Sequence, residues 1–425
     1  MLLLGAGPIG LDMAASAIKN GFNVTIIEKG PTIASNVHTW GNVELFSPNQ
    51  FNSSLVGREI LTELNLPIPE HDIFPTAKQL INEYFQPIYE YLKQHNNCII
   101  MTNTEVISVT RSGLSKNKAI GRTNPIRLNS KFNILIREQN ETKNEDILSG
   151  FDAVIDCTGC LQNPNYMGPD GMPAIGESIL RNIYPTPIYT SIPYSNPSHY
   201  STDYQYNNNN SIIIGAGSSA ITSIKMLQNA AKEHGYLSDV LWITRKLPGQ
   251  APYSRYPDDP LPQRDALYRL GNHLAEACSV DTPPYRFRLT LSQRCLPDSP
   301  QSSSTEQDQT TTSTTTTTLE VHNIISNVGY HPNTDMIKEL QVHYCWATEG
   351  PMKLAASMMS SSSGSSSDCL QQVSQGGESL HNPESRFFII GMKSYGRGSA
   401  FLMKIGYEQV QLVLQMLLEE FPLKH

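Results

Sequence analysis

Two glycine-rich turns in this chain have the spacing of a dinucleotide phosphate site. The first follows the short apolar run 2–4 and leads into a helix-like stretch that ends near residue 20. In this spacing the first glycine permits a tight turn, the second lets a pyrophosphate approach the backbone, and the third lets the helix pack against the strand. The N-terminus of that helix then faces the phosphates. The predicted contacts are Gly5, Gly7, Pro8, Ile9 and Gly10.

An acidic residue stands where such a unit meets a ribose. Glu28 ends the β-branched run 24–27 and lies 18 residues after Gly10. A carboxylate at the end of this second strand accepts hydrogen bonds from ribose hydroxyls. The alternative is a plain strand–helix–strand unit that binds no ligand.

The second turn repeats this pattern with a different charge at its far end. After the apolar run 211–214, the predicted contacts are Gly215, Gly217, Ser218, Ser219 and Ala220. Arg245, followed by Lys246, ends the next apolar run. Arginine suits the 2′-phosphate of NADP because its guanidinium makes charge-assisted, bidentate hydrogen bonds. The alternative is a solvated surface arginine. An acid in one unit and a base in the other predict FAD in the first site and NADPH in the second.

These motifs require strands and helices that alternate along the chain, and the apolar pattern predicts them. Expected strands are 2–4, 24–27, 98–109, 151–157, 211–214, 240–244, 321–328 and 386–390. Expected helices run to about residue 20, from 76 to 94 with Thr76 as cap, to about 234, and over 401–420. The first strand is expected to be short, since only four residues precede Gly5.

We therefore predict an α/β protein of the two-domain Rossmann-like type, with an NADPH domain inserted into a discontinuous FAD domain. The FAD domain would comprise 1–165 and 321–425, and the NADPH domain 211–320. Residues 166–210 would form an irregular connection. The Ser/Thr-rich segments 299–318 and 360–367 are expected to be disordered insertions, because they contain too little apolar surface to bury.

Composition excludes several other classes. The 425 residues carry a net charge of −8, and only 16% of them are charged, so no basic surface for nucleic acid is expected. The seven cysteines are scattered and odd in number, which favours a reducing, cytoplasmic location over a secreted disulfide framework. No run of about 18 apolar residues predicts a membrane span. No metal-ligand spacing is present.

Three further stretches resemble the flavoproteins with two dinucleotide-binding domains, within them the branch similar to flavin-containing monooxygenases and pyridine nucleotide-disulfide oxidoreductases. Residues 152–159 resemble the strand that ends in Ala-Thr-Gly between the domains of that family, and 324–333 resemble its second copy. Residues 387–397 with Phe401-Leu402 resemble the C-terminal segment that returns beside the flavin. The run from 348 to 410 looks like that of bacterial-type FAD/NAD(P)-binding oxidoreductases.

The resemblance implies further FAD contacts. They are Val106 at the adenine, Thr158 and Gly159 at the domain crossing, Gly391, Lys393 and Ser394 near the ribityl chain, and Phe401 and Leu402 at a helix start facing the flavin. The ring-lining candidates are Trp40, Phe46, Ser47 and Asn49, although Trp40 and Phe46 could equally be core residues. Where the family has Gly-Asp, this chain has Gly391-Met392. We expect Lys393, Ser394 or Tyr395 to take over part of the missing carboxylate's role.

The resemblance also implies hydride transfer from NADPH to the flavin, followed by reaction with O₂ and oxygenation of a small nitrogen or sulfur nucleophile through a C4a-hydroperoxyflavin. No catalytic side chain is assigned. The usual monooxygenase fingerprint is absent, and Ser198-His199-Tyr200 occupies its region out of frame. Two alternatives stay open: an NADPH-dependent flavin or disulfide/electron-transfer reductase, and a degenerate flavin-binding interaction module.

Two further features have a functional and a structural interpretation. Cys157 and Cys160 form a C-x-x-C pair, but they overlap the strand-ending motif, so we expect a buried Cys157 and an incidental Cys160 without redox activity. In the proline-rich segment 252–264, Arg255 and Arg264 could contact an anionic part of the cofactor or substrate. The alternative is an ordinary surface loop.

Overall fold

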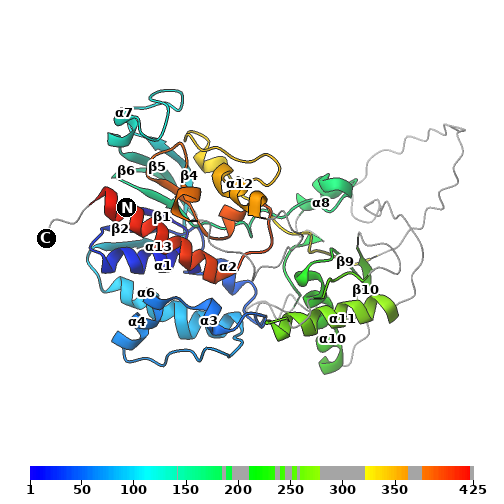
Figure 1. Ribbon diagram of the computed structural model, residues 1–425. Coiled ribbons are helices and arrows are strands. Elements are labelled where there is room, and N and C mark those ends of the chain that lie inside the picture. Colours follow the sequence, from blue (N-terminus) through cyan, green and yellow to red (C-terminus); the bar gives the residue numbers. More distant parts are fainter. Residues whose placement is uncertain are drawn as a thin grey trace, which may run out of the picture.

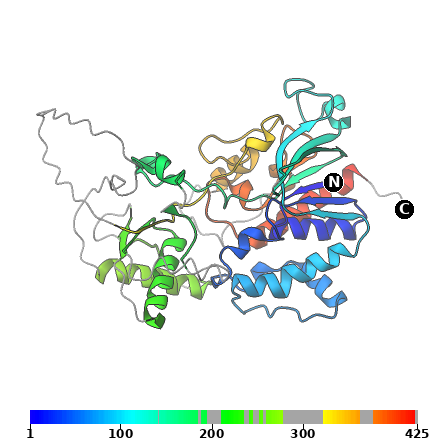
Figure 2. The ribbon, with the colours of Figure 1, turned by 180° about the vertical axis from the view of Figure 1, so that it is seen from behind.

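The chain folds into two lobes, each built around its own parallel sheet (Figure 1). The computed structural model describes residues 1–140, 142–183, 188–193, 210–234, 240–244, 251–255, 259–277, 321–361 and 376–421. The first lobe holds both described ends of the chain, and the second lobe contains the middle of it (Figures 1 and 2). The described helices include none that is long and apolar enough to cross a bilayer.

The first lobe contains most of the described elements. Its strands are β1 (Leu2–Leu4), β2 (Val24–Ile27), β3 (Cys98–Met101), β4 (Thr104–Arg111), β5 (Phe132–Glu138), β6 (Glu145–Phe151), β7 (Val154–Asp156) and β12 (Phe387–Ile389). Its α-helices are α1 (Pro8–Lys19), α2 (Ser35–His38), α3 (Asn49–Asn52), α4 (Leu55–Glu63), α5 (Ala77–Leu80), α6 (Gln86–Lys93), α7 (Pro125–Asn129), α12 (Met352–Ser361) and α13 (Met403–Glu420). Shorter helical turns are the π-helical η1 (Ile81–Phe85) and the 3₁₀ turns η6 (Asp335–Ile337), η8 (Gly377–Leu380) and η9 (Gly391–Tyr395).

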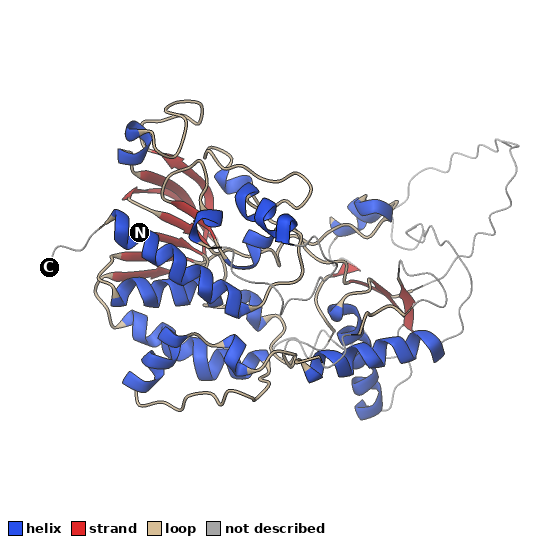
Figure 3. Ribbon diagram, viewed as in Figure 1, coloured by secondary structure: helices blue, strands red, loops and turns tan. Residues whose placement is uncertain are grey.

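The central sheet of this lobe is parallel, with strand order β12-β7-β1-β2-β3. Alternate residues of its strands enter two separate apolar cores. Leu3, Ile155 and Phe388 face the core under the helices, while Leu4, Val154 and Phe387 face the other core. The helices α1 and α13 cover the first face, and the antiparallel sheet β4-β5-β6 covers the second (Figure 3). Such short strands are stable here because both of their faces are buried.

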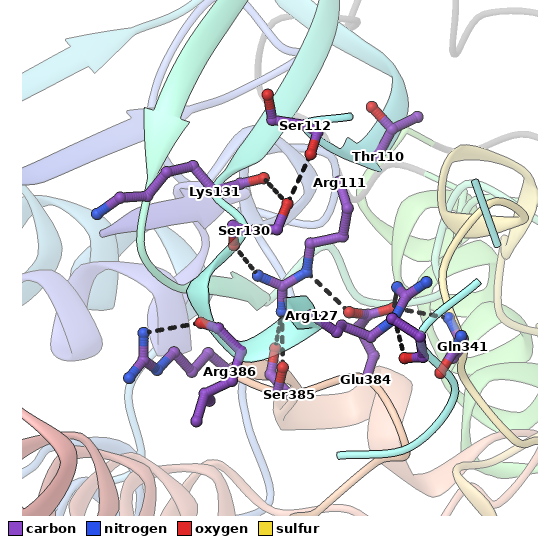
Figure 4. Close-up of polar contacts among 12 residues, drawn as sticks. Thr110, Arg111, Ser112, Arg127, Ser130, Lys131, Gln341, Glu384, Ser385 and Arg386 are labelled. Carbon is purple, nitrogen blue, oxygen red and sulfur yellow. Dashed lines mark hydrogen bonds and ion pairs between the residues drawn. The ribbon is translucent and has the colours of Figure 1, made fainter. Parts of the chain in front are cut away.

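The segment before β12 is fastened to the antiparallel sheet by a buried cluster of charges. The carboxylate of Glu384 accepts a hydrogen bond from Nε of Arg111 at 2.8 Å and from a terminal nitrogen of Arg127 at 2.7 Å. All three side chains are fully buried. Figure 4 shows Glu384 between the two guanidinium groups, with Arg111 also donating to the Ser130 carbonyl. The remaining Arg127 donors contact loop carbonyls. The cluster therefore has a structural role: it joins the segment before β12 to the antiparallel sheet.

The expected helix over 76–94 is present, with an irregularity inside it. Thr76 forms the predicted cap: its hydroxyl accepts from the Gln79 N–H, and the Gln79 side chain accepts from the Thr76 N–H. The helix then passes from α5 through the π-helical turn η1 into α6. The strands expected over 98–109 are β3 and β4, and they enter different sheets. Similarly, the end of β6 and β7 replace the single strand expected over 151–157.

The second lobe contains the four-stranded parallel sheet β10-β9-β11-β8. Its elements are the 3₁₀ turn η2 (Pro169–Gly171), α8 (Glu177–Arg181), β8 (Ile188–Tyr189), β9 (Ser211–Ile214), α10 (Ser218–His234), β10 (Val240–Ile243), α11 (Pro262–Ala277) and β11 (Asn323–Ser326). A small core that includes Ile213, Ile221 and Ile325 lies between the sheet and its helices.

This sheet corrects two predicted boundaries. β11 pairs with β9 along its whole length, so the strand after residue 321 belongs to the second lobe, and the return to the first lobe comes later. The predicted irregular connection 166–210 contains α8, and it contains β8, which pairs with β11. Sequence alone missed β8 because two strand residues carry no periodicity. In the segment 360–367, Ser360 and Ser361 end α12; the rest of it and segment 299–318 lie outside the described residues.

Candidate dinucleotide sites

The first glycine turn has the geometry that its sequence predicts. Gly5 has φ of 93°, a left-handed conformation that favours glycine. A Cβ on Gly10 would lie 2.0 Å from the carbonyl oxygen of Gly5, so only glycine lets α1 begin this close to β1. A Cβ on Gly7 would meet no described atom within 4 Å. The backbone at Gly7 is therefore open to a ligand, next to the N-terminus of α1 where Pro8 is the first helical residue.

Glu28 lies against this turn. Its carboxylate accepts one hydrogen bond from the Ala6 N–H and another from the Gly30 N–H, both at 2.8 Å. The side chain is 8% exposed at the end of β2. The Glu28 carbonyl accepts from the Thr104 N–H at the start of β4, the strand that carries Val106. Val106 lies at a register shift of this strand and packs against the second core.

A second helix N-terminus meets the same turn. The side chain of Ile9 lies under both Gly391 and Gly406, where a Cβ would come within 3.2 and 2.4 Å of it. These contacts hold the start of α13 beside the start of α1. Leu402 is the N-cap residue of α13 and makes no side-chain cap, and its carbonyl accepts from the Ile405 N–H at 3.0 Å. Phe401 stacks edge-on against Tyr395 at 5.5 Å.

The segment that replaces the family's Gly-Asp is closed by an internal network. The Gly391 N–H donates to Oε1 of Gln409 at 2.8 Å, and the Ser394 hydroxyl donates to the Gly391 carbonyl at 2.7 Å. The Gln409 amide in turn donates to the Ser394 hydroxyl at 3.0 Å. Ser394 is fully buried, so its side chain fixes the turn. The sequence did not point to Gln409, because a single glutamine on a helix carries no spacing signal.

Lys393 points to the end of β7. Its ammonium lies 2.5 Å from Oδ2 of Asp156 and 3.1 Å from the Thr158 hydroxyl, and the lysine and aspartate side chains are both fully buried. Asp156 also accepts from the Thr158 N–H and hydroxyl. The pair thus sets the turn of Thr158 and Gly159, two predicted FAD contacts, and Asp156 is a site residue that the sequence did not single out.

The four predicted ring-lining residues have different surroundings. Trp40 packs against the first core, whereas Phe46 lies in a small cluster with Leu402. The Ser47 hydroxyl donates to the Asn52 side chain at 2.8 Å, and the Asn49 amide donates to the Glu70 carbonyl at 3.0 Å. Ser47 and Asn49 therefore shape their own loop, and Phe46 is the member placed beside the start of α13.

A buried carboxyl group lies behind this loop. Asp12, on α1, accepts a hydrogen bond from the Ser54 hydroxyl, and its Oδ2 has no partner among the described residues. Tyr84, from the π-helical turn, contacts the same hydroxyl at 3.1 Å. Burial raises the pKa of Asp12 to about 7, although the Ser54 hydrogen bond opposes the shift. Burial also raises the pKa of Tyr407, which donates to the Asn52 carbonyl nearby.

The second glycine turn repeats the backbone pattern of the first. The N–H groups of Gly5 and Gly215 each donate to the last residue of the neighbouring strand, Ile27 and Ile243. A Cβ on Gly215 would lie 2.2 Å from the Asn327 carbonyl oxygen, just as one on Gly5 would lie 3.0 Å from that of Cys157. A Cβ on Gly217 meets no described atom within 4 Å, and Ala220 is buried in the place that Gly10 takes in the first turn.

Aromatic side chains hold this second turn from behind. The Trp242 indole donates to the Gly215 carbonyl at 2.8 Å, and the Tyr253 hydroxyl donates to the Gly217 carbonyl at 3.2 Å. Tyr253 stacks between Trp242 and Tyr268, and the Tyr268 hydroxyl lies 3.3 Å from that of Ser218. Ser218 and Ser219 begin α10, and the first N–H groups of a helix suit an anion. The predicted phosphate contacts Arg245 and Lys246 lie outside the described residues.

The remaining candidate residues are two buried cysteines and two arginines that form ion pairs. Cys157 and Cys160 are free thiols, both buried, and burial raises the pKa of Cys157 well above its usual range and that of Cys160 to about 12. Arg255 pairs with Asp265 at 2.9 Å, and Arg264 pairs with Asp259 at 2.7 Å. The two arginines thus form ion pairs within their own segment, and no anion contact is assigned to them.

Comparison with known proteins agrees with this architecture. Residues 2–122 match the family described as pyridine nucleotide-disulphide oxidoreductase. A search of curated protein sequences found no match. The structure is similar to that of the bacillithiol disulfide reductase Bdr (YpdA) from Bacillus cereus, with a TM-score of 0.59, 15% identity, and coverage of 99% of this chain and 98% of that one. The corresponding enzyme from Staphylococcus aureus is similar with a TM-score of 0.54 and 14% identity. The match covers 99% of this chain and 98% of that one.

A mutant form of a flavin monooxygenase from Stenotrophomonas maltophilia is also similar, with a TM-score of 0.51, 16% identity and 98% coverage of both chains. These likenesses confirm the predicted fold class, an α/β chain with the two-domain FAD/NAD(P)-binding Rossmann-like fold. With the family match, they confirm the predicted resemblance to a flavoprotein of the pyridine nucleotide-disulfide oxidoreductase type.

Proposed function

We propose that this protein is an FAD-dependent oxidoreductase that oxidises NADPH. The observation that carries the proposal is the repeat of one nucleotide-binding turn in two lobes, with Gly7 and Gly217 open in each. Glu28 supplies the acid of the first site. The second site has Arg245 in the sequence position that suits a 2′-phosphate.

The residues of the first lobe fit FAD. The turn at Gly5 and Gly7 with the start of α1 would hold the pyrophosphate, and Glu28 would accept from the ribose. The start of α13, with Phe46 and Leu402 beside it, would face the ring end. When bound, FAD supplies the capacity to accept a hydride and to pass the electrons on.

The other residues of the site hold these groups in place. Lys393 and Asp156 set the turn after β7, and Gln409 with Ser394 sets the turn before α13. In the second lobe, Trp242 and Tyr253 hold the carbonyls of Gly215 and Gly217, and the N–H groups at the start of α10 would face the nucleotide. The protein's part is therefore to bind and orient two dinucleotides.

For the second half of the reaction, we propose oxygenation of a small nitrogen or sulfur nucleophile. NADPH, a proton, O₂ and the substrate would give NADP⁺, water and the oxygenated product, so the electrons balance. The likeness to a flavin monooxygenase supports this outcome. The burial of Cys157 and Cys160 also supports it, because a disulfide relay needs an accessible thiolate.

A disulfide reductase is the second candidate, favoured by the likeness to two bacillithiol disulfide reductases over nearly the whole chain. The experiment is to purify the protein, record its visible spectrum, titrate it with NADPH without oxygen and then admit air. A bound yellow cofactor that NADPH bleaches is expected; without it, the protein is not an NADPH-oxidising flavoprotein. Peroxide release equal to NADPH consumption, with no oxygenated product from amine and thioether substrates, would refute oxygenation. Turnover with a disulfide under anaerobic conditions would establish the reductase instead.

A further inference from the structure

One leucine of the second lobe is buried in the first. Leu261 directly precedes α11 and has no exposed surface. Its apolar cluster contains Leu402, which is 6% exposed, with Phe46, Phe51 and Ala400 packed around the pair. All four of these neighbours belong to the first lobe. Figure 1 shows α11 reaching from the second lobe towards α3, the helix that carries Phe51.

A buried ion pair holds Leu261 in this position. Asp259 and Arg264 form a bidentate pair, with Nε to Oδ2 at 2.9 Å and the terminal nitrogen to Oδ1 at 2.7 Å. Their side chains are 3% and 4% exposed. Oδ1 of Asp259 also accepts from the Leu261 N–H at 2.9 Å, and the Leu261 carbonyl accepts from the Arg264 N–H at 3.0 Å. The pair therefore closes a tight turn whose apex is Leu261, and α11 continues from it.

The place that Leu261 reaches is the predicted ring end of the first site. Leu402 is the N-cap residue of α13, and Phe46 belongs to the segment predicted to line the flavin ring. The turn that carries Leu261 is followed by α11, whose Tyr268 contacts Ser218 in the second glycine turn. One short segment thus links the nucleotide turn of the second lobe to the ring end of the first.

We propose that Asp259, Leu261 and Arg264 form a docking element that positions the NADPH lobe against the FAD lobe for hydride transfer. They are positioning residues, because they act through the placement of the two lobes. This inference rests on the proposed function. Hydride transfer requires the reacting atoms within about 3–3.5 Å of each other, and small misplacements lower the rate steeply. A buried apolar anchor at the lobe boundary restricts such displacements.

The test compares Leu261→Ala, which removes the anchor, with Leu261→Met, which keeps its volume. In anaerobic stopped-flow experiments, Leu261→Ala is expected to lower the limiting rate of flavin reduction by NADPH by about 10-fold or more. The dissociation constant for NADPH and the FAD content should stay within about twofold, because neither nucleotide turn is altered. Leu261→Met should restore most of the rate.

A second readout does not depend on turnover. Amide hydrogen exchange of the oxidised, full-length protein should speed up over residues 43–51 and 399–405 in Leu261→Ala, because these segments lose their cover. Asp259→Asn should give the same pattern, since it weakens the pair that holds the turn. Arg255→Gln is the matched control: it breaks an ion pair of the same segment that is half exposed, and both readouts should stay at the wild-type value.

The outcomes separate the two proposals. A wild-type rate and unchanged exchange in Leu261→Ala would overturn the docking element while the flavoprotein proposal stands. Equal losses in Leu261→Met and Leu261→Ala would also overturn it, since they show a general loss of structure. If the wild-type protein binds FAD but NADPH fails to bleach it, the proposed function fails, and the exchange experiment still decides whether Leu261 docks the lobes.

Discussion

The ammonium group of Lys393 lies 2.5 Å from the carboxylate of Asp156, and neither side chain has any exposed surface. The two residues come from distant parts of the chain, the middle of η9 and the end of β7. Their pairing joins the C-terminal segment of the first lobe to the turn that leads out of it. A buried pair of this kind is costly to break from one side, because the remaining charge has no water to solvate it.

Replacing Lys393 with methionine should therefore destabilise the protein strongly. Lys393→Met leaves Asp156 buried and unpaired, and we expect a loss of about 3–5 kcal/mol in the free energy of unfolding. Chemical denaturation followed by circular dichroism measures it. The double variant Lys393→Met with Asp156→Asn should recover part of the loss. A double variant no more stable than the single one would show that the charge pair is not the cause.

Removing the carboxylate of Glu28 should weaken FAD binding. Glu28→Ala removes the group that holds the Ala6 N–H and that would meet the ribose. Because hydrogen bonds to charged groups contribute about 1.5–3 kcal/mol, the dissociation constant of FAD should rise by about 10-fold or more. Titration of the apoprotein with FAD, followed by flavin fluorescence, measures it. Glu105→Ala, at an ion pair with Lys29 nearer the surface, is the control and should bind FAD normally.

The stability of the protein should depend on the ionisation of Asp12. Its folded-state pKa, about 7, lies above the value of about 3.9 in an unfolded chain. The folded state therefore binds the proton more tightly than the unfolded state does. The resulting contribution to the free energy of unfolding is fully present below about pH 4 and is lost as pH rises towards 7. Asp12→Asn cannot titrate, so its free energy of unfolding should fall less between pH 4 and pH 7 than that of the wild type. Denaturation curves at several pH values compare the two slopes; equal slopes would contradict the assignment to Asp12.

Arg245 should distinguish NADPH from NADH. If its guanidinium binds the 2′-phosphate, Arg245→Ala should raise the dissociation constant of NADPH by about 10-fold or more and leave that of NADH nearly unchanged. Anaerobic titrations with each nucleotide measure both constants. Arg269→Ala, which removes an exposed arginine of the same lobe, serves as the control. An equal effect on NADPH and NADH would refute the phosphate contact.

The two clustered cysteines should be dispensable for NADPH oxidation. Both are buried, and burial raises the pKa of each thiol, so little thiolate forms near neutral pH. Cys157→Ser and Cys160→Ser should oxidise NADPH with an artificial acceptor at rates within about twofold of the wild type. Loss of NADPH-dependent disulfide reduction in each single variant would instead identify them as a redox pair.

Much of the fold could be predicted from local patterns. The glycine turns, the strands β1, β2 and β9, and the cap at Thr76 follow from spacing, periodicity and side-chain capping, which act over a few residues. The predictions that were wrong concern which strands pair with each other when they lie far apart in the sequence. The sequence shows that 323–326 forms a strand, but only its partner β9 assigns that strand to the second lobe.

For the sites, the sequence alone determined the positions of the two glycine turns and of Glu28 beside the first of them, because each motif lies within one continuous unit. The tertiary structure decided which contacts the other residues make. Lys393 pairs with Asp156, Arg264 pairs with Asp259, and Leu261 crosses to Leu402. The partners of the first and last of these contacts lie more than 100 residues apart. Asp259 and Arg264 are near neighbours, but the sequence does not show that their pair is buried at the boundary between the lobes, since that burial depends on how the lobes pack.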